Sequence, residues 1–392
     1  MTRPTFEVAD ILRVHGDRFL NRYRSSFDFQ QLKAFRAIQR CRTAALGGHR
    51  DACPSCGYQA ISYNSCRNRH CPKCQAQARE RWLAAREREL LDTNYFHVVL
   101  TVPHELNVLA LENPRLFYDL LFTASAQTLL KIASHPKHLG AEIGVTAILH
   151  TWGQNLLLHP HIHCVIPAGG LSPDHRQWVR PRYPFFLPVK VLSRVFRGKF
   201  LAGLKRLHRS KKLQCVGPAA PLADPRQFAK LLRRLHRYDW VVYAKPAFRG
   251  PMQVLRYLGR YTHRVAISNH RLLACAQERV TFRWKDYAHG GKQGVMTLST
   301  TEFLRRFFLH VLPKGFVRIR HFGFLANRWR ASRLALGRQL LAASGSTEQE
   351  VRAHDMSESP SLWHCPRCGA SMIVIQRFTA AELSACTYFD SS

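Results

Sequence analysis

Acidic side chains are scarce in this sequence. Its 392 residues include 25 Asp and Glu against 59 Lys and Arg, which leaves a formal net charge of +34 at pH 7. The basic residues recur along the whole chain instead of gathering in one tail, so folded surfaces must carry them. Such a surface calls for a polyanionic partner, and nucleic acid is the usual one.

Long apolar runs are also missing. We find no run of about 18 or more apolar residues and no apolar segment typical of a signal peptide. The sequence therefore predicts no membrane span and a cytoplasmic location. Because thiols stay reduced in the cytosol, the 12 cysteines predict metal sites rather than disulfides. Hydrophobic residues at 46% indicate a folded globular protein of two or three domains.

The strongest local signal is a pair of Cys-x-x-Cys motifs. Cys53 and Cys56 form the first, and Cys71 and Cys74 the second, fourteen residues further on. Four thiolates at this spacing can bind one zinc ion tetrahedrally, so we predict a zinc site from these four residues. Other residues that can bind zinc lie nearby, so the sequence does not decide which four are the ligands: they are His49, Cys66 and His70. A third Cys-x-x-Cys motif near the C-terminus, Cys365 and Cys368, could form a second zinc site with His364 or Cys386.

A short apolar segment carries histidines at alternate positions. Its sequence, residues 157–167, reads Leu-Leu-His-Pro-His-Ile-His-Cys-Val-Ile-Pro. Side chains alternate between the faces of a strand, so His161 and His163 point to one face and Ile162 to the other. Two such imidazoles can bind one divalent metal ion, with His159 as a flanking residue. An isolated motif of this kind is also typical of a half-exposed polar face.

The surrounding pattern predicts an α+β fold with an antiparallel sheet. Strands are expected at 95–103, 144–150 and 157–167, with a helix at 114–132 between the first two. Further on, a β-hairpin is expected around residues 279–298, followed by a helix over 303–311.

A later helix begins near Pro251 and extends to residue 264. Tyr257 and Tyr261 are four positions apart and are neighbours on one face, with Arg260 and Arg264 repeating the same spacing beside them. Taken alone, a tyrosine pair at this spacing is more typical of a packed amphipathic face than of a catalytic site.

Several cations are candidates for DNA contact. Arg67 and Arg69 lie between the first two cysteine motifs, and Arg318 and Arg320 alternate with aromatic residues, as in a surface that stacks single-stranded bases. The alternative for the second pair is a packed strand with a solvated cationic face. Arg260 and Arg264 complete the set.

These motifs together indicate phosphoryl transfer. A divalent metal held by His161 and His163 would neutralise charge on a scissile phosphate, and a tyrosine would attack it. A third metal ligand is needed, for which Gln154 is the candidate, with His263 the second choice. Two rivals remain: a carboxylate-triad nuclease using Asp224, Asp239 and Asp286, and a zinc-bearing DNA-binding regulator without catalysis.

In these motifs the chain resembles the rolling-circle insertion-sequence transposases of the two-tyrosine IS91 family, within the His-hydrophobe-His (HUH) superfamily. The matching pieces are the cysteine module with its Ser-Cys-Arg-Asn-Arg-His-Cys-Pro segment (65–72), His159–His163, and Tyr257–Ile267. The resemblance implies metal-dependent nicking of single-stranded DNA at transposon ends through 5′-phosphotyrosine links at Tyr257 and Tyr261. It also implies transfer to a target DNA and a bacterial protein that joins the nucleoid when bound to DNA.

The expected organisation follows from this resemblance. Residues 1–50 form a helical segment, 51–91 a zinc-binding module, 92–330 the HUH catalytic domain, and 331–392 a tail with a possible second zinc motif. The expected cofactors are structural Zn²⁺ and a catalytic Mg²⁺ or Mn²⁺.

Overall fold

The structure is a computed structural model. It describes residues 6–182, 186–248, 266–286, 290–343 and 364–385, and the single positions Gln253 and Gly259.

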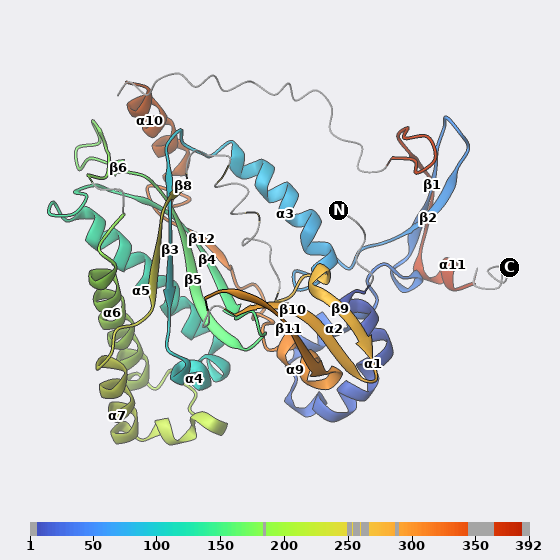
Figure 1. Cartoon of the computed structure of the whole chain (residues 1–392), viewed down its shortest axis with the longest axis horizontal. Coiled ribbons are helices and arrows are strands. Elements are labelled where there is room, and N and C mark those ends of the chain that lie inside the picture. Colours follow the sequence, from blue (N-terminus) through green and yellow to red (C-terminus); the bar gives the residue numbers. More distant parts are fainter. Residues whose placement is uncertain are drawn as a thin grey trace.

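Helices and strands are mixed along the chain (Figure 1). The α-helices are α1 (Val8–Tyr23), α2 (Phe29–Gln39), α3 (Pro72–Glu87), α4 (Asn107–Glu112), α5 (Pro114–Ser134), α6 (Val189–Arg209), α7 (Pro225–His236), α9 (Thr300–Phe308), α10 (Arg330–Ala343) and α11 (Ala380–Ala385). The strands are β1 (Gly48–Ala52), β2 (Gln59–Tyr63), β3 (Tyr95–Thr101), β4 (Gly144–Trp152), β5 (Leu158–Pro167), β6 (Gly170–Leu171), β7 (Trp178–Val179), β8 (Val242–Phe248), β9 (Leu272–Ala276), β10 (Arg279–Asp286), β11 (Lys292–Ser299), β12 (Ile319–Gly323) and β13 (Ile373–Phe378).

A five-stranded sheet forms the centre of the molecule. Its strand order is β12-β4-β5-β3-β8, and every neighbouring pair is antiparallel. The predicted α+β class is therefore confirmed, and the strands at 95–101, 144–152 and 158–167 agree closely with the predicted ranges. The predicted helix at 114–132 is α5, and the predicted hairpin is β10–β11.

The two faces of this sheet have different environments. One face packs against α5 and α6, and apolar residues at alternate positions of three strands, such as Val98, Leu149 and Ile162, enter the main core. The opposite face includes Tyr95, Ile148 and Val165, against which Trp82 and Leu83 of α3 pack. Figure 1 shows α3 passing across this side of the sheet. Because the faces alternate along each strand, this second face is also the one that carries His161 and His163.

A second core joins segments far apart in sequence. Residues of α1 and α2, including Phe19 and Phe35, pack with Phe282 of β10 and with Phe303 and Phe308 of α9. The N-terminal helices, which the sequence assigned to a segment of their own, therefore share a core with residues from beyond position 266. The small sheet β11-β10-β9 covers this core.

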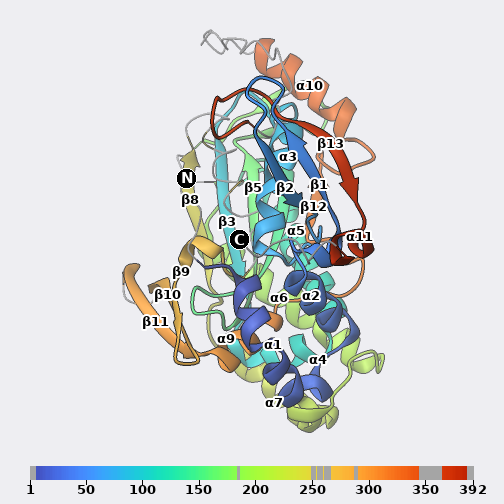
Figure 2. The ribbon, with the colours of Figure 1, turned by 90° about the vertical axis from the view of Figure 1, so that its right-hand side faces the viewer.

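A third sheet projects from the body as an arm. Its order is β13-β1-β2, so the C-terminal strand β13 pairs with a strand from residues 48–52. Figure 2 shows β1, β2 and β13 side by side with α11 at their end. We call residues 48–63 and 364–378 the arm. Among the described helices, none is long and apolar enough to cross a membrane.

Candidate metal centre and DNA-processing site

Three histidines converge on the α3-facing side of the central sheet. His161 and His163 lie on β5, and His150 lies directly opposite His161 on the neighbouring strand β4. One ring nitrogen from each lies within 4.8 Å of those of the other two, and the Nε2 atoms of His161 and His163 are 3.0 Å apart. All three are at most 9% exposed. The cluster can therefore bind one metal ion through three imidazoles.

Hydrogen bonds to the other ring nitrogens orient two of these imidazoles. Nδ1 of His161 donates to the carbonyl oxygen of His159 at 2.6 Å, which leaves its Nε2 with a free lone pair. Nδ1 of His163 lies 2.8 Å from Nε2 of His97, a buried residue of β3. Nε2 of His163 faces Nε2 of His161, 3.0 Å away. Partners of this kind commonly orient metal-binding histidines.

Burial favours the neutral form of His161 and of His97. It lowers the pKa of His161 to about 3 and the pKa of His97 to about 3, because a charged imidazolium would lose its hydration. Neutral imidazole is the form that coordinates a metal. A set of three nitrogen ligands suits a transition-metal ion, whereas Mg²⁺ prefers oxygen ligands. Of the two predicted ions, Mn²⁺ is therefore the better match.

The structure offers a third imidazole besides the predicted third ligand, Gln154. Gln154 lies in the turn between β4 and β5, four positions beyond His150, and its backbone carbonyl accepts a hydrogen bond from Arg271. Strand pairing sets His150 opposite His161, and this places a third imidazole in the cluster. The sequence contained one indication of this: His150 is two positions from Ile148, so both side chains point to the same face of β4, the strand that pairs with β5.

Tyr257, Tyr261, Arg260, Arg264 and His263 lie outside the described residues. Gly259, between the two tyrosines, is described and is buried. A Cβ atom built on it would lie 2.8 Å from Cδ1 of Leu83. Leu83 belongs to the layer on the histidine side of the sheet. Position 259 thus lies on the same side of the sheet as the metal cluster.

The cysteines form two groups that differ from the predicted one. Cys71 and Cys74 gather with Cys41 and Cys66, whereas Cys53 and Cys56 gather with Cys365 and Cys368. The predicted single set of Cys53, Cys56, Cys71 and Cys74 is therefore corrected. The physical reason is local: Cys71 begins helix α3, which carries its motif into the second core, while Cys53 follows strand β1 into the arm.

Distances within the first group fit zinc. The Sγ atom of Cys74 lies 3.5 Å from that of Cys41 and 3.6 Å from that of Cys66, and the Sγ atoms of Cys71 and Cys41 are 3.7 Å apart. Four ligands about 2.3 Å from a zinc ion are separated by roughly 3.8 Å in a tetrahedron, whereas a disulfide would bring two sulfurs to about 2.05 Å. Hydrogen bonding from Cys66 lowers the pKa of the Cys41 thiol to about 7, which eases its deprotonation.

Three of the four described arginines that were predicted to contact DNA have partners inside the protein. Arg69 donates to the carbonyl oxygens of Pro313 and Phe316, and Arg318 donates to Gln75. Arg320 pairs with Asp119 and stacks over aromatic rings. The register of β12 turns Arg320 to the sheet face opposite the histidines, which agrees with the alternative of a packed strand at this position. Arg67 is exposed and stays a candidate for phosphate contact.

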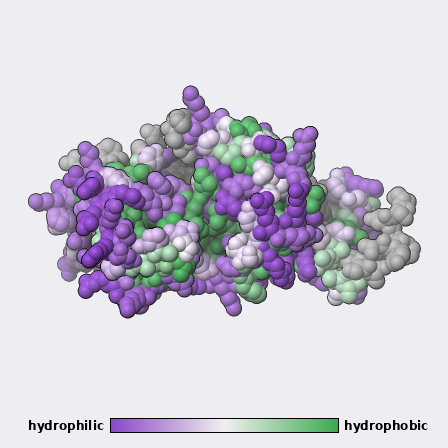
Figure 3. All heavy atoms as spheres, turned by 90° about the horizontal axis from the view of Figure 1, so that it is seen from below, coloured by the Kyte–Doolittle hydropathy of each residue, from purple (hydrophilic) through white to green (hydrophobic). Residues whose placement is uncertain are grey.

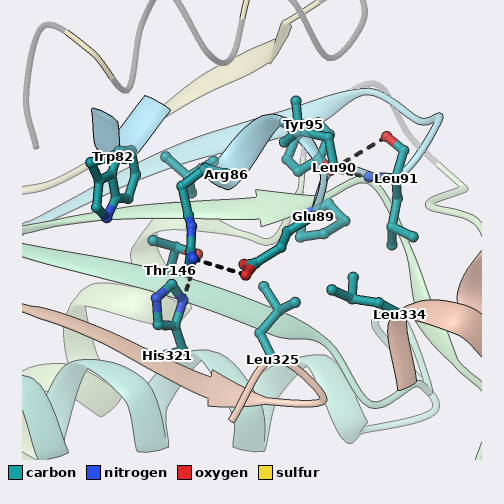
Figure 4. A pocket seen from close by; sticks show the side chains of 12 residues that line it. Trp82, Arg86, Glu89, Leu90, Leu91, Tyr95, Thr146, His321, Leu325 and Leu334 are labelled. Atoms are coloured by element: carbon teal, nitrogen blue, oxygen red, sulfur yellow. Dashed lines mark hydrogen bonds and ion pairs between the residues drawn. The ribbon is translucent and has the colours of Figure 1, made fainter. Parts of the chain in front are cut away.

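A pocket lies on the histidine face, about 13 Å along β4 from His150 at the usual strand rise. Figure 4 shows Arg86 reaching Glu89 at its wall, with Trp82, Tyr95 and His321 around it. Arg330 is also 3.5 Å from the same carboxylate. The lining of the pocket thus combines one ion pair, Arg86 with Glu89, with aromatic and aliphatic side chains. Figure 3, a view from below, shows a mostly hydrophilic face with apolar residues towards its middle.

The aspartates of the rival carboxylate triad lie on separate elements. Asp224 caps the N-terminus of α7, Asp239 pairs with Arg197 at 3.2 Å, and Asp286 ends β10. Within the part of the chain that the structure describes, no group able to hold a metal includes a carboxylate. The described residues therefore offer imidazole and thiolate sites in place of a triad.

Two family models match the chain. One described as "Transposase zinc-binding domain" matches residues 11–102, and one described as "Putative transposase" matches residues 144–333. The first range contains Cys41, Cys66, Cys71 and Cys74, and the second contains all three clustered histidines.

Two curated proteins are similar over most of their length. "Putative transposase y4qJ" of Sinorhizobium fredii (strain NBRC 101917 / NGR234) is 51% identical over 386 residues, which cover 96% of this chain and 97% of that protein. "Transposase for insertion sequence element IS801" of Pseudomonas savastanoi pv. phaseolicola is 28% identical over 299 residues, or 74% of this chain and 68% of that protein. No solved structure matches the chain.

Proposed function

This chain belongs to the IS91 family of insertion-sequence transposases, and from that premise we propose that it nicks single-stranded DNA and transfers the cut strand through a tyrosine. Tyr257 and Tyr261 are the proposed nucleophiles. His150, His161 and His163 are the proposed ligands of the catalytic divalent ion. The proposed substrates are the single-stranded ends of the transposon and a target DNA.

One observation carries this proposal: the imidazole cluster and Gly259 share one side of the central sheet. Leu83 contacts both the Gly259 backbone and the layer that covers Ile148 and Val165. Gly259 stands between Tyr257 and Tyr261 in the sequence, so its place on this side of the sheet supports a reaction on the histidine face.

The chemistry balances without an added reductant or oxidant. The tyrosine hydroxyl gives up its proton, its oxygen forms a bond to phosphorus, and the bond from phosphorus to the 3′ oxygen breaks. The departing 3′ oxygen takes up a proton and becomes a free hydroxyl. A divalent cation bound by the histidines would neutralise charge on the phosphate oxygens. His161 is suited to this role because its Nδ1 donates to the carbonyl oxygen of His159, which leaves the lone pair on Nε2.

The covalent product retains the energy of the phosphodiester. A 3′ hydroxyl from another strand can therefore attack the 5′-phosphotyrosine and reseal, which gives strand transfer in place of hydrolysis. Two tyrosines allow one to hold a cut strand while the other attacks the next. The net charge of +34 supports binding of the DNA backbone.

Covalent capture tests the proposal. Purified protein, Mn²⁺ or Mg²⁺ and single-stranded DNA spanning each end of the element are resolved on a denaturing gel. The wild-type chain should give a metal-dependent protein–DNA adduct, which His161→Ala and the double variant Tyr257→Phe, Tyr261→Phe should lose. Binding of the same DNA should persist in the tyrosine variant, because only two hydroxyl groups are removed.

Tyr243 provides a demanding control. It is exposed on β8, and strand pairing places it in one row with Val99 and His163, on the histidine face. Tyr243→Phe should keep the adduct. An adduct that survives loss of Tyr257 and Tyr261 but disappears in Tyr243→Phe would overturn the assignment of the nucleophile. Tight binding with no adduct at either end under either metal would favour a DNA-binding regulator.

A further inference from the structure

The second cysteine group joins two segments more than 300 residues apart. We infer that Cys53, Cys56, Cys365 and Cys368 form a second structural zinc site that fastens the C-terminal strand to the N-terminal module. Residues 365 and 368 lie outside the range 11–102 that matches the zinc-binding family model. The inference concerns the arm and does not depend on the proposed tyrosine chemistry.

The sulfur atoms have the spacing of a tetrahedral zinc site. Sγ of Cys53 lies 3.5 Å from Sγ of Cys368, and Sγ of Cys56 lies 3.5 Å from Sγ of Cys365. All four sulfurs lie within 4.8 Å of one another. Ligands on one zinc ion are about 3.8 Å apart, whereas disulfide-bonded sulfurs are about 2.05 Å apart. Each long-range contact is therefore too long for a disulfide and close to the zinc value.

The two motifs are built alike. Cys53 and Cys365 each begin a Cys-Pro-x-Cys-Gly sequence, and the two glycines, Gly57 and Gly369, have φ values of 70° and 76°. In each, the glycine N–H donates to the first cysteine carbonyl, at 3.0 Å and 2.9 Å. The first cysteine N–H in turn donates to the residue after the glycine, at 2.8 Å in both.

This shared geometry distinguishes the two motifs from the third. The sequence Cys71-Pro-Lys-Cys74 continues into Gln75 and a helix, without a glycine turn. Two tight turns of the same kind can face each other and present four thiolates to one ion. The glycines are required because a left-handed φ is strained for other residues.

The arm has almost no apolar core to hold it together. Among its residues 48–63 and 364–378, the buried hydrophobic side chains are those of Cys53 and Cys365 alone. Ile61, Ile373 and Val374 are 45% exposed or more. Small folded units with so little buried apolar surface usually depend on a metal or a disulfide. Since these sulfurs are not disulfide-bonded, the metal is the remaining source of stability.

The arrangement makes the attachment of β13 depend on residues at the other end of the chain. Strand β13 pairs with β1 from Gly48↔Phe378 to Ala52↔Ile373, immediately next to Cys53. Loss of a ligand on either side should release the same ion and loosen the same strand. If the two motifs instead bound metal independently, loss of a cysteine in one motif would leave the metal of the other in place.

Zinc content measured on the purified full-length protein by mass spectrometry tests the assignment. The wild-type chain should hold two zinc ions. Cys53→Ser with Cys365→Ser should hold one, because both changes strike the same site. Cys53→Ser with Cys74→Ser should hold none, because each change strikes a different site. Cys215→Ser and Cys275→Ser, which alter part-exposed cysteines outside both groups, should keep two.

Hydrogen exchange of peptides from β13 supplies the second measurement. Cys53→Ser should speed exchange at residues 373–378 at least about tenfold, although the altered residue is 320 positions away. Peptides from β4 and β5 serve as the internal check that the body stays folded. One zinc ion in the wild-type chain, or unchanged exchange of β13 in Cys53→Ser, would overturn the inference. A retained pair of ions in Cys53→Ser with Cys365→Ser would overturn it equally.

Discussion

His97 should control metal affinity without touching the metal. Its Nε2 lies 2.8 Å from Nδ1 of His163, and it is 3% exposed. The change His97→Phe keeps the ring but removes this partner. Nδ1 of His163 then loses its hydrogen bond, and the ring is free to place its proton on Nε2, which blocks the lone pair that binds metal.

The expected magnitude follows from two independent estimates. Loss of a ligand-orienting partner typically weakens metal binding about 10- to 100-fold. That ratio equals roughly 1.4–2.8 kcal/mol, and a buried polar group left without its hydrogen bond costs about 1–3 kcal/mol. The two ranges agree, so His97→Phe should raise the dissociation constant for Mn²⁺ by about one to two orders of magnitude.

Titration calorimetry with Mn²⁺ measures this effect directly. His97→Gln should recover part of the affinity, because its side-chain oxygen can accept the hydrogen bond from His163. His104→Phe is the matched control, since that imidazole is 86% exposed beyond the end of β3. Wild-type affinity in His97→Phe would refute the reasoning that this hydrogen bond sets the protonated nitrogen of His163.

Three further predictions follow from the described residues. His150→Ala should weaken Mn²⁺ binding at least about tenfold while Gln154→Ala leaves it unchanged, and the opposite pattern in calorimetry would return the third ligand to Gln154. Burial lowers the pKa of His310 from 6.5 to about 4, so proton uptake favours unfolding as pH falls through this window. The free energy of unfolding should drop there by about 3 kcal/mol, and urea titrations should show a smaller drop in His310→Gln; equal drops would contradict the assignment. Gly323→Ala should cost on the order of 3 kcal/mol in thermal melts, because φ is 62° and the added Cβ would lie 1.8 Å from a carbonyl oxygen. Gly290→Ala, with φ of 74° and open space around it, should cost about 1 kcal/mol, and equal losses would exclude the clash as the cause.

Local patterns in the sequence were sufficient to predict the α+β fold class and the positions of the strands β3, β4 and β5. Alternation of apolar and polar residues placed His161 and His163 on one face, since side chains in a strand alternate whatever the strand pairs with. Pro114 predicted the start of α5, and Gly290 with Gly291 predicted the turn of the β10–β11 hairpin. These signals are local, so they do not depend on the rest of the chain.

Long-range pairing decided the ligand sets. His150 joins the imidazole cluster because the register of β4 against β5 sets it opposite His161, and register is a property of two strands together. Cys41 joins Cys71 because α2 and α3 meet in one core, and Cys365 joins Cys53 because β13 pairs with β1. Proximity in sequence therefore misled the grouping of the cysteines.

One signal for the correct grouping was present in the sequence. The two Cys-Pro-x-Cys-Gly motifs share a glycine that the Cys71 motif lacks, and this difference separates turn-forming motifs from one that starts a helix. The arginines carried no comparable signal. Whether Arg320 faces DNA or the protein interior depends on which face of β12 meets α5, and only the assembled sheet determines that.

The sequence by itself determined the chemistry available to this protein: imidazoles on a strand, thiolates in knuckles, paired tyrosines and a large positive charge. Each of these is a property of residue type and spacing. The tertiary structure decided which of these groups meet, because a metal site needs ligands from several segments at distances of a few ångströms. Those distances arise only when sheets and cores bring the segments together.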